Sequence, residues 1–167
     1  MQVLPTLVLG CLLIRPTAVP AQQGERYTLD GDEVAIYNLA GSLTVDPGTG
    51  AVSVGMVRGG ADAAKLRVER GELDGRETLR VVYPAESIVY SGMERGSSTT
   101  LEVREDGTFG DGDSREHHRG RKVRMSGQGK GLRAHADYHV VGRIGGGTGR
   151  VAIETGSGDV RLLRSPN

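Results

Sequence analysis

The chain has 167 residues, enough for one domain of ordinary size, and it contains 27 glycines, one phenylalanine and no tryptophan. Many glycines and few aromatics predict tight turns and thin layers of aliphatic side chains, and they exclude a thick aromatic core. The 21 basic and 21 acidic residues balance, so the chain lacks the net positive charge typical of nucleic-acid-binding proteins, and no nucleic-acid partner is expected.

Residues 1–21 form a segment of distinct composition, with no acid and a single base, Arg15. An unbroken apolar run extends from Leu7 to Ile14. It is too short to span a bilayer, which takes about 20 residues, but it is typical of the core of a secretory signal peptide, with a cleavage site after Val19-Pro20-Ala21. We therefore expect a signal peptide at 1–21, no transmembrane helix, and a location in the periplasm, on the outer surface or outside the cell. The first ten residues carry no Lys or Arg, and the alternative is a buried N-terminal strand.

Cys11 is the only cysteine. Val8-Leu9-Gly10-Cys11 resembles a bacterial lipobox, which would make Cys11 a lipidation site, although the apolar stretch ahead of it is short and uncharged. If cleavage follows Ala21, the mature chain has no disulfide, no thiol nucleophile and no thiolate metal site. No cofactor is expected.

Residues 22–167 are predicted to form a single all-β domain. Residues 22–32 are polar and are interpreted as a lead-in. After them, apolar residues recur at every second position in short runs separated by Gly, Pro and Asp, which is the pattern of half-buried strands. Only residues 60–67 have a composition that suits a helical turn. The alternating pairs and triplets are Val34 and Ile36; Leu43 and Val45; Val52, Val54 and Met56; Leu66 and Val68; Leu79, Val81 and Tyr83; Leu101 and Val103; Val123 and Met125; Val151 and Ile153; and Val160 and Leu162.

Two distant segments share one pattern. Val34–Val45 aligns with Val151–Leu162: Val-Ala-Ile recurs intact, Gly41 aligns with Gly158, and the apolar residues that follow each glycine also align. The pattern indicates a strand, a corner that glycine permits, and a second strand with the same face inward. Units of this kind stack into β-solenoids. The alternative is two ordinary hairpins of a β-sandwich.

The strand–Gly–strand segments Asp32–Val45 and Gly149–Leu163, with the alternating stretch Leu132–Val141, resemble bacterial putative adhesin domains of unknown function, which are related to the auto-transporter adhesin head family. The resemblance covers roughly a quarter of the chain. It implies a right-handed β-solenoid, a cell-envelope location and no established catalysis. Such proteins usually continue with further units, whereas this chain stops at Asn167. We therefore expect an open C-terminal edge, which reflects a truncated chain, is capped by the middle segment, or pairs with another copy.

His135, Asp137 and His139 are the sharpest candidates for chemistry. They alternate with Ala136 and Tyr138, so on a strand all three would project from one face, about 6–7 Å apart. Two imidazoles and a carboxylate can bind Zn²⁺ or a similar ion. The interpretation that we favour is a solvated outer face, because no further ligand is visible in the sequence.

Four other segments have a chemical and a plain interpretation, and the plain one is favoured for each. Glu116-His117-His118 would put adjacent histidines on opposite faces of a strand. Asp106–Asp113 alternates carboxylates and glycines like a calcium-binding turn, but only once. The basic cluster between Arg115 and Arg133 would suit an anionic glycan or lipid head group, but acids lie just upstream and no aromatic is interleaved. Gly145–Gly149 lacks the Lys-Ser or Lys-Thr and the helix of a phosphate loop.

The sequence therefore predicts a non-enzymatic, exported cell-envelope protein that acts as a structural or adhesin-like module. Its partner would be a protein or glycan at an exposed sheet face or at the C-terminal edge, and self-association is a further expectation. The alternative functions are a polysaccharide-acting β-helix enzyme, for which carboxylates and bases must converge on one groove, and a metal-binding envelope protein.

Overall fold

A computed structural model describes residues 24–48, 50–110, 120–142, 150–158 and 160–162. This part of the chain is all-β, as predicted, and its single 3-10 turn, η1 (Ala63–Lys65), falls within residues 60–67. Predictions for the signal peptide, Cys11, Glu116–His118 and Gly145–Gly149 lie outside the described residues. The strands are β1 (Glu25–Leu29), β2 (Glu33–Ala40), β3 (Leu43–Pro47), β4 (Val52–Gly59), β5 (Arg67–Leu73), β6 (Arg76–Val82), β7 (Ser87–Val89), β8 (Ser98–Arg104), β9 (Gly120–Ser126), β10 (His135–Gly142), β11 (Arg150–Ser157) and β12 (Val160–Leu162).

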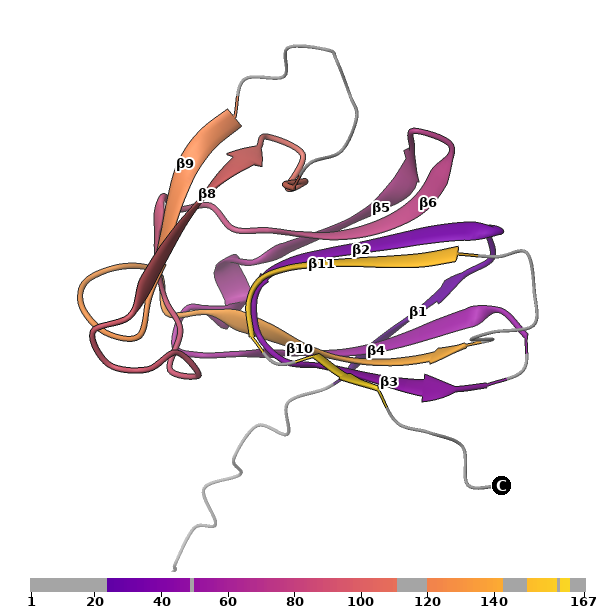
Figure 1. The fold of residues 1–167 in the computed structure, drawn as a ribbon, viewed down its shortest axis with the longest axis horizontal. Helices are drawn as coiled ribbons and strands as arrows, with labels where there is room; N and C mark the ends of the chain where they lie inside the picture. Colours follow the sequence, from indigo (N-terminus) through magenta and orange to yellow (C-terminus); the bar gives the residue numbers. More distant parts are fainter. Residues whose placement is uncertain (1–23, 49, 111–119, 143–149, 159, 163–167) are drawn as a thin grey trace, which may run out of the picture.

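The strands form three sheets. The first has the order β1-β4-β10-β3-β12, the second β11-β2-β6-β5 and the third β7-β9-β8. The first two lie face to face, and the third stands at the end where β2 bends into β3 (Figure 1). Within the described residues the sheets neither close into a barrel nor form a solenoid. The β-solenoid is therefore not confirmed, and the alternative, a β-sandwich-like arrangement, fits the observed layers.

The lead-in predicted for residues 22–32 is wrong in part, because β1 occupies most of it and pairs antiparallel with β4. Its burial pattern explains the error. Only Leu29 is fully buried, while Arg26 and Thr28 are exposed at the border of the sheet. An edge strand with one wet face shows few apolar residues.

Strand β10 lies inside the first sheet, between two strands that are neighbours in sequence. It pairs antiparallel with β4 and parallel with β3. β3 and β4 follow each other closely in the sequence, yet they do not pair with each other, because the later strand separates them. The first sheet therefore depends on a segment from far along the chain.

The two segments that align in the sequence lie side by side. β11 pairs in parallel with β2, Val151 beside Val34, and β12 pairs in parallel with β3, Val160 beside Leu43. The register is the one in which the sequences align. Each segment runs from the second sheet through a glycine corner into the first sheet (Figure 1).

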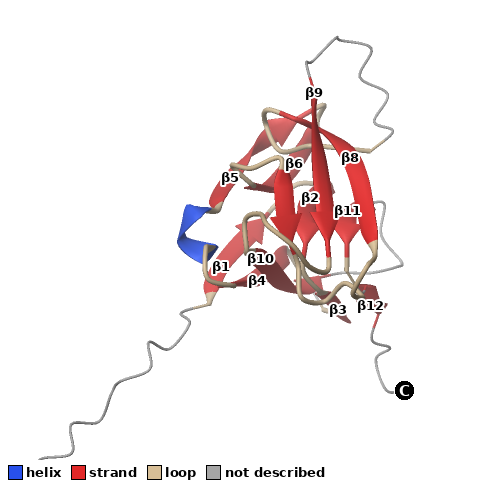
Figure 2. Ribbon diagram, turned by 90° about the vertical axis from the view of Figure 1, so that its left-hand side faces the viewer, coloured by secondary structure: helices blue, strands red, loops and turns tan. Residues whose placement is uncertain are grey.

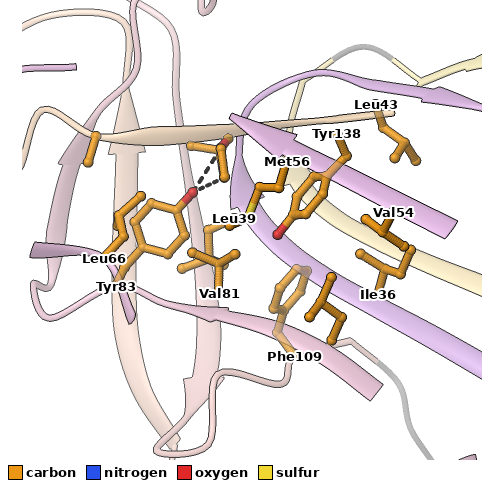
Figure 3. Packing of buried hydrophobic residues seen from close by; sticks show 14 of the residues in the cluster. Ile36, Leu39, Leu43, Val54, Met56, Leu66, Val81, Tyr83, Phe109 and Tyr138 are labelled. Atoms are coloured by element: carbon orange, nitrogen blue, oxygen red, sulfur yellow. Dashed lines mark hydrogen bonds between the residues drawn. The ribbon is translucent and has the colours of Figure 1, made fainter. Parts of the chain in front are cut away.

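Aliphatic side chains fill the space between the two facing sheets. Ile36 of β2 lies near Val54 of β4, and Met56 and Tyr138 come from the neighbouring strands of the first sheet (Figure 3). The third sheet packs across the bend, with β8 and β9 in front of β2 and β11 in Figure 2. Contact there is close, since a methyl group on Gly156 of β11 would come within 2.8 Å of both Leu101 and Met125. The bend is therefore covered from outside.

Candidate functional site

The outer face of β10 carries the three predicted candidates. His135, Asp137 and His139 alternate with the buried Ala136 and Tyr138, so they share one face, as the alternation indicated. The side chains are partly solvated, with exposed fractions of 24% for His135, 42% for Asp137 and 55% for His139.

Asp137 contacts the corner that leads into β3, and His139 contacts β3 itself. Asp137 Oδ1 accepts hydrogen bonds from the backbone N–H and the hydroxyl group of Ser42, both at 2.8 Å. Ser42 belongs to the β2–β3 corner, so this carboxylate fixes the corner to β10. His139 Nε2 lies 2.5 Å from Oδ2 of Asp46, a residue of β3.

His135 turns toward the third sheet. Its ring lies over Gly59 and packs against Tyr90, with 5.5 Å between the ring centroids. Its Nε2 is 3.5 Å from Asp137 Oδ2, its link to the other two candidates. Among the described residues, no group of three or more His, Cys, Asp or Glu side chains is arranged to hold a metal ion. The three side chains share one face of β10, but they do not converge on a common position.

In the segment Asp106–Asp113, for which an ordinary loop was favoured over a calcium-binding turn, the described part forms a local turn. Asp106 Oδ1 accepts hydrogen bonds from the N–H and the hydroxyl group of Thr108, at 2.9 and 2.8 Å. Asp111 and Asp113 lie outside the described residues. The Asp106 carboxylate is therefore occupied by its own loop.

A polar network at the bend gave no signal in the sequence. The Tyr83 hydroxyl lies 2.8 Å from Asn38 Oδ1 and 2.8 Å from the Ala40 carbonyl, and Asn38 Nδ2 donates to the Ala136 carbonyl at 2.7 Å. Burial raises the pKa of Tyr83 well above its usual value, so the hydroxyl remains a donor. Asn38 lies in the apolar strand β2, and Tyr83 follows β6, 45 residues later in the chain. No local sequence pattern connects the two residues.

One side of the molecule presents a border that crosses both facing sheets. β11 pairs only with β2, and β12 only with β3, in the part of the chain that the structure describes. β11 is thus an outer strand of the second sheet and β12 an outer strand of the first. We call this border the β11–β12 edge. It coincides with the C-terminal edge expected from the sequence.

In the described residues, no helix has the length and apolar character needed to cross a bilayer. No family model, curated protein or solved structure matches the chain. The resemblance to putative adhesin domains stays an expectation, and arguments about function rest on the geometry.

Proposed function

We propose that the chain is a non-enzymatic, exported module of the cell envelope, structural or adhesive, that joins a second copy of itself by strand addition at the β11–β12 edge. The observation that carries this proposal is the parallel pairing of β2–β3 with β11–β12 in one constant register. The second segment docks on the first through the parallel ladder, together with Val151 and Ile153 side chains that pack against the core, and its outer border can accept a further strand.

The charges on the two borders of the second sheet support this choice. β5, at one border, carries Arg67, Glu69, Arg70 and Glu72 within seven residues. Charged side chains of this kind protect an edge strand from pairing with another chain. β11, at the other border, has Arg150 and Glu154 among small or uncharged residues. The β11–β12 edge therefore has the weaker protection.

The same parallel pairing of β2–β3 with β11–β12 supports an inference about how these strands are stacked. We infer that β2–β3 and β11–β12 are two units of one strand–glycine–strand type, stacked as successive turns of a solenoid stack, within a protein whose other strands build a sandwich. The glycine corners support this inference: a methyl group on Gly158 would lie 1.8 Å from the Gly41 carbonyl oxygen, so the corners nest directly. No observation on the described residues favours the polysaccharide-acting enzyme or the metal-binding protein over this function.

Sedimentation velocity over a range of protein concentrations tests the proposal, together with amide hydrogen exchange. We expect a concentration-dependent dimer in which exchange slows in β11 and β12 and stays unchanged in β5. A monomer at every concentration, or slower exchange confined to other strands, would contradict strand addition at this edge.

A pair of variants sharpens the test. Thr155 pairs with the buried Asn38, so its side chain shares the inward face of the sheet. Thr155→Lys adds an inward-pointing charge at the edge, a device that blocks pairing, and we expect it to abolish the dimer. Glu72→Lys changes an exposed charge on β5 and should leave the dimer intact. Thermal melts followed by circular dichroism check that both variants are folded.

A further inference from the structure

An open hollow of about 410 Å³ lies where the first sheet meets the loops of the third. Its lining includes Arg133 and His135 at the start of β10, Ser91 and Arg95 after β7, and Gln128 of the β9–β10 loop. Three separate stretches of chain, residues 60–61, 89–95 and 127–135, thus converge on one space whose volume is within the range of small-molecule sites, roughly 300–1,000 Å³.

The charged groups that line the hollow are all basic. No Asp or Glu is among the lining residues. Neither Arg95 nor Arg133 has a side-chain hydrogen bond or ion pair within the described ranges, and both residues are exposed. The neighbouring acid Asp62 is already engaged, since Oδ1 lies 2.7 Å from Lys65 Nζ and Oδ2 accepts from the backbone N–H of Arg133 at 2.9 Å. Arg95 and Arg133 therefore line the hollow without a direct side-chain ion pair, and only the charge of Asp62 acts on Arg133 from nearby.

The backbones that carry the two arginines are held in place by close contacts at glycine. A methyl group on Gly127 would lie 2.3 Å from the carbonyl oxygen of Glu94, the residue before Arg95. A methyl group on Gly60 would lie 2.3 Å from the Arg133 carbonyl oxygen, which also accepts a hydrogen bond from Asp62 N at 2.9 Å. The loops thus pack backbone against backbone, which fixes the positions from which both guanidinium groups extend.

We propose that this hollow binds a small organic anion through its carboxylate or phosphate oxygens. The planar guanidinium fork matches both groups with two parallel hydrogen bonds, and Arg95 and Arg133 supply two such forks. Ser91 and Gln128 add neutral donors, and His135 lines the hollow at the start of β10. This site is independent of strand addition at the β11–β12 edge, and either can exist without the other.

Titrations followed by ¹H–¹⁵N NMR test the site, with inorganic phosphate in one arm and D-glucuronate in the other, at an ionic strength held constant with sodium chloride. We expect saturable shifts at the amides of Gly127, Gly129 and Arg133. Removing one charged hydrogen-bonding partner typically weakens binding by about tenfold or more, so Arg95→Gln and Arg133→Gln should each have that effect. Arg26→Gln on β1, a residue that pairs with Gly55 and does not line the hollow, is the control and should bind like the parent protein.

The arms distinguish the two sources of the oxyanion. Saturation by phosphate alone indicates a phosphorylated ligand, and saturation by glucuronate alone indicates an acidic sugar; each supports the site. Shifts that stay linear for both anions, or affinities that the Arg95→Gln/Arg133→Gln double variant shares with the parent protein, would overturn the proposal. The substituted side chains are exposed, and an unchanged spectrum away from the hollow verifies the fold.

Discussion

Tyr83 and Tyr138 are both buried, but their hydroxyl groups have different surroundings. The Tyr83 hydroxyl joins Asn38 and the Ala40 carbonyl at the bend. The Tyr138 hydroxyl points into the space between the sheets (Figure 3) and has no hydrogen-bond partner among the described residues. A buried polar group without a partner costs about 1–3 kcal/mol of desolvation. The two side chains therefore form a natural pair for comparison.

We expect Tyr83→Phe to lower the free energy of unfolding by about 1–3 kcal/mol, because Asn38 Oδ1 and the Ala40 carbonyl lose a buried donor. Tyr138→Phe should be neutral or stabilising by about 1 kcal/mol, because it removes a hydroxyl group that is desolvated without compensation. Urea unfolding followed by far-ultraviolet circular dichroism measures both. Equal destabilisation by the two substitutions would contradict this assignment.

Glu77 connects β6 to the β1–β2 turn. Its Oε2 accepts hydrogen bonds from the N–H groups of Asp30 at 2.5 Å and Gly31 at 3.1 Å, and its Oε1 pairs with Arg70. Partial burial by itself raises the pKa of Glu77. The hydrogen bonds from Arg70, Asp30 and Gly31 together have the larger effect, so the pKa falls below the usual value of 4.5. The carboxylate is therefore better stabilised in the folded chain than in the unfolded one.

The sign of the pH dependence follows. A lowered folded-state pKa contributes stability that is fully present above about pH 4.5 and is lost as the pH falls through the folded value. We expect the parent protein to be more stable than Glu77→Gln at about pH 6, and the difference to shrink toward about pH 3. Urea midpoints across this range measure it. A difference that stays constant across this range would contradict the role of the Glu77 carboxylate.

At the scale of elements, the glycine corner allows one chain segment to contribute a strand to each of two sheets. Gly41 has φ of +137°, and a methyl group there would lie 1.8 Å from the Ala136 carbonyl oxygen. Both the backbone conformation and the contact with β10 require glycine. Gly158 repeats this requirement against Gly41 itself, so Ala136, Gly41 and Gly158 form a continuous line of backbone contacts.

We expect Gly41→Ala to destabilise the protein by about 4 kcal/mol or more, because strain and overlap add. Gly50→Ala is the matched control. Gly50 also has positive φ, +107°, but open space surrounds its Cα, so only the strain remains, about 1–2 kcal/mol. Thermal melting followed by circular dichroism compares the two. Similar losses would show that the close contact between Gly41 and the Ala136 carbonyl contributes nothing.

At the scale of the whole molecule, period-two alternation was sufficient to predict an all-β chain. It was also sufficient to align Val34–Val45 with Val151–Leu162, and these segments proved to be neighbours in the same register. The pattern succeeds because strands that pair in parallel within one sheet must bury the same face.

Alternation did not reveal the layers. Nothing in the sequence of β10 specifies that it lies between β3 and β4, because sheet order depends on long-range packing rather than on local pattern. The candidates on β10 failed to converge for a related reason: a shared face is a property of the strand, whereas convergence requires curvature or a wall. Arg133 belongs to the basic cluster that the sequence shows, but Arg95 gave no signal, because the chain segments that line the hollow meet only after folding.

The central position of β10 has a consequence for how the chain acquires its structure. Any process that releases the polypeptide from its N-terminus onward, such as synthesis or threading across a membrane, delivers β3 and β4 long before their common partner. Until β10 has emerged, β4 can pair only with β1, and β3 has no neighbouring strand to pair with, so completion of this sheet must wait for most of the chain. Such non-local pairing makes folding slow and leaves the unfinished intermediate in need of protection from premature association.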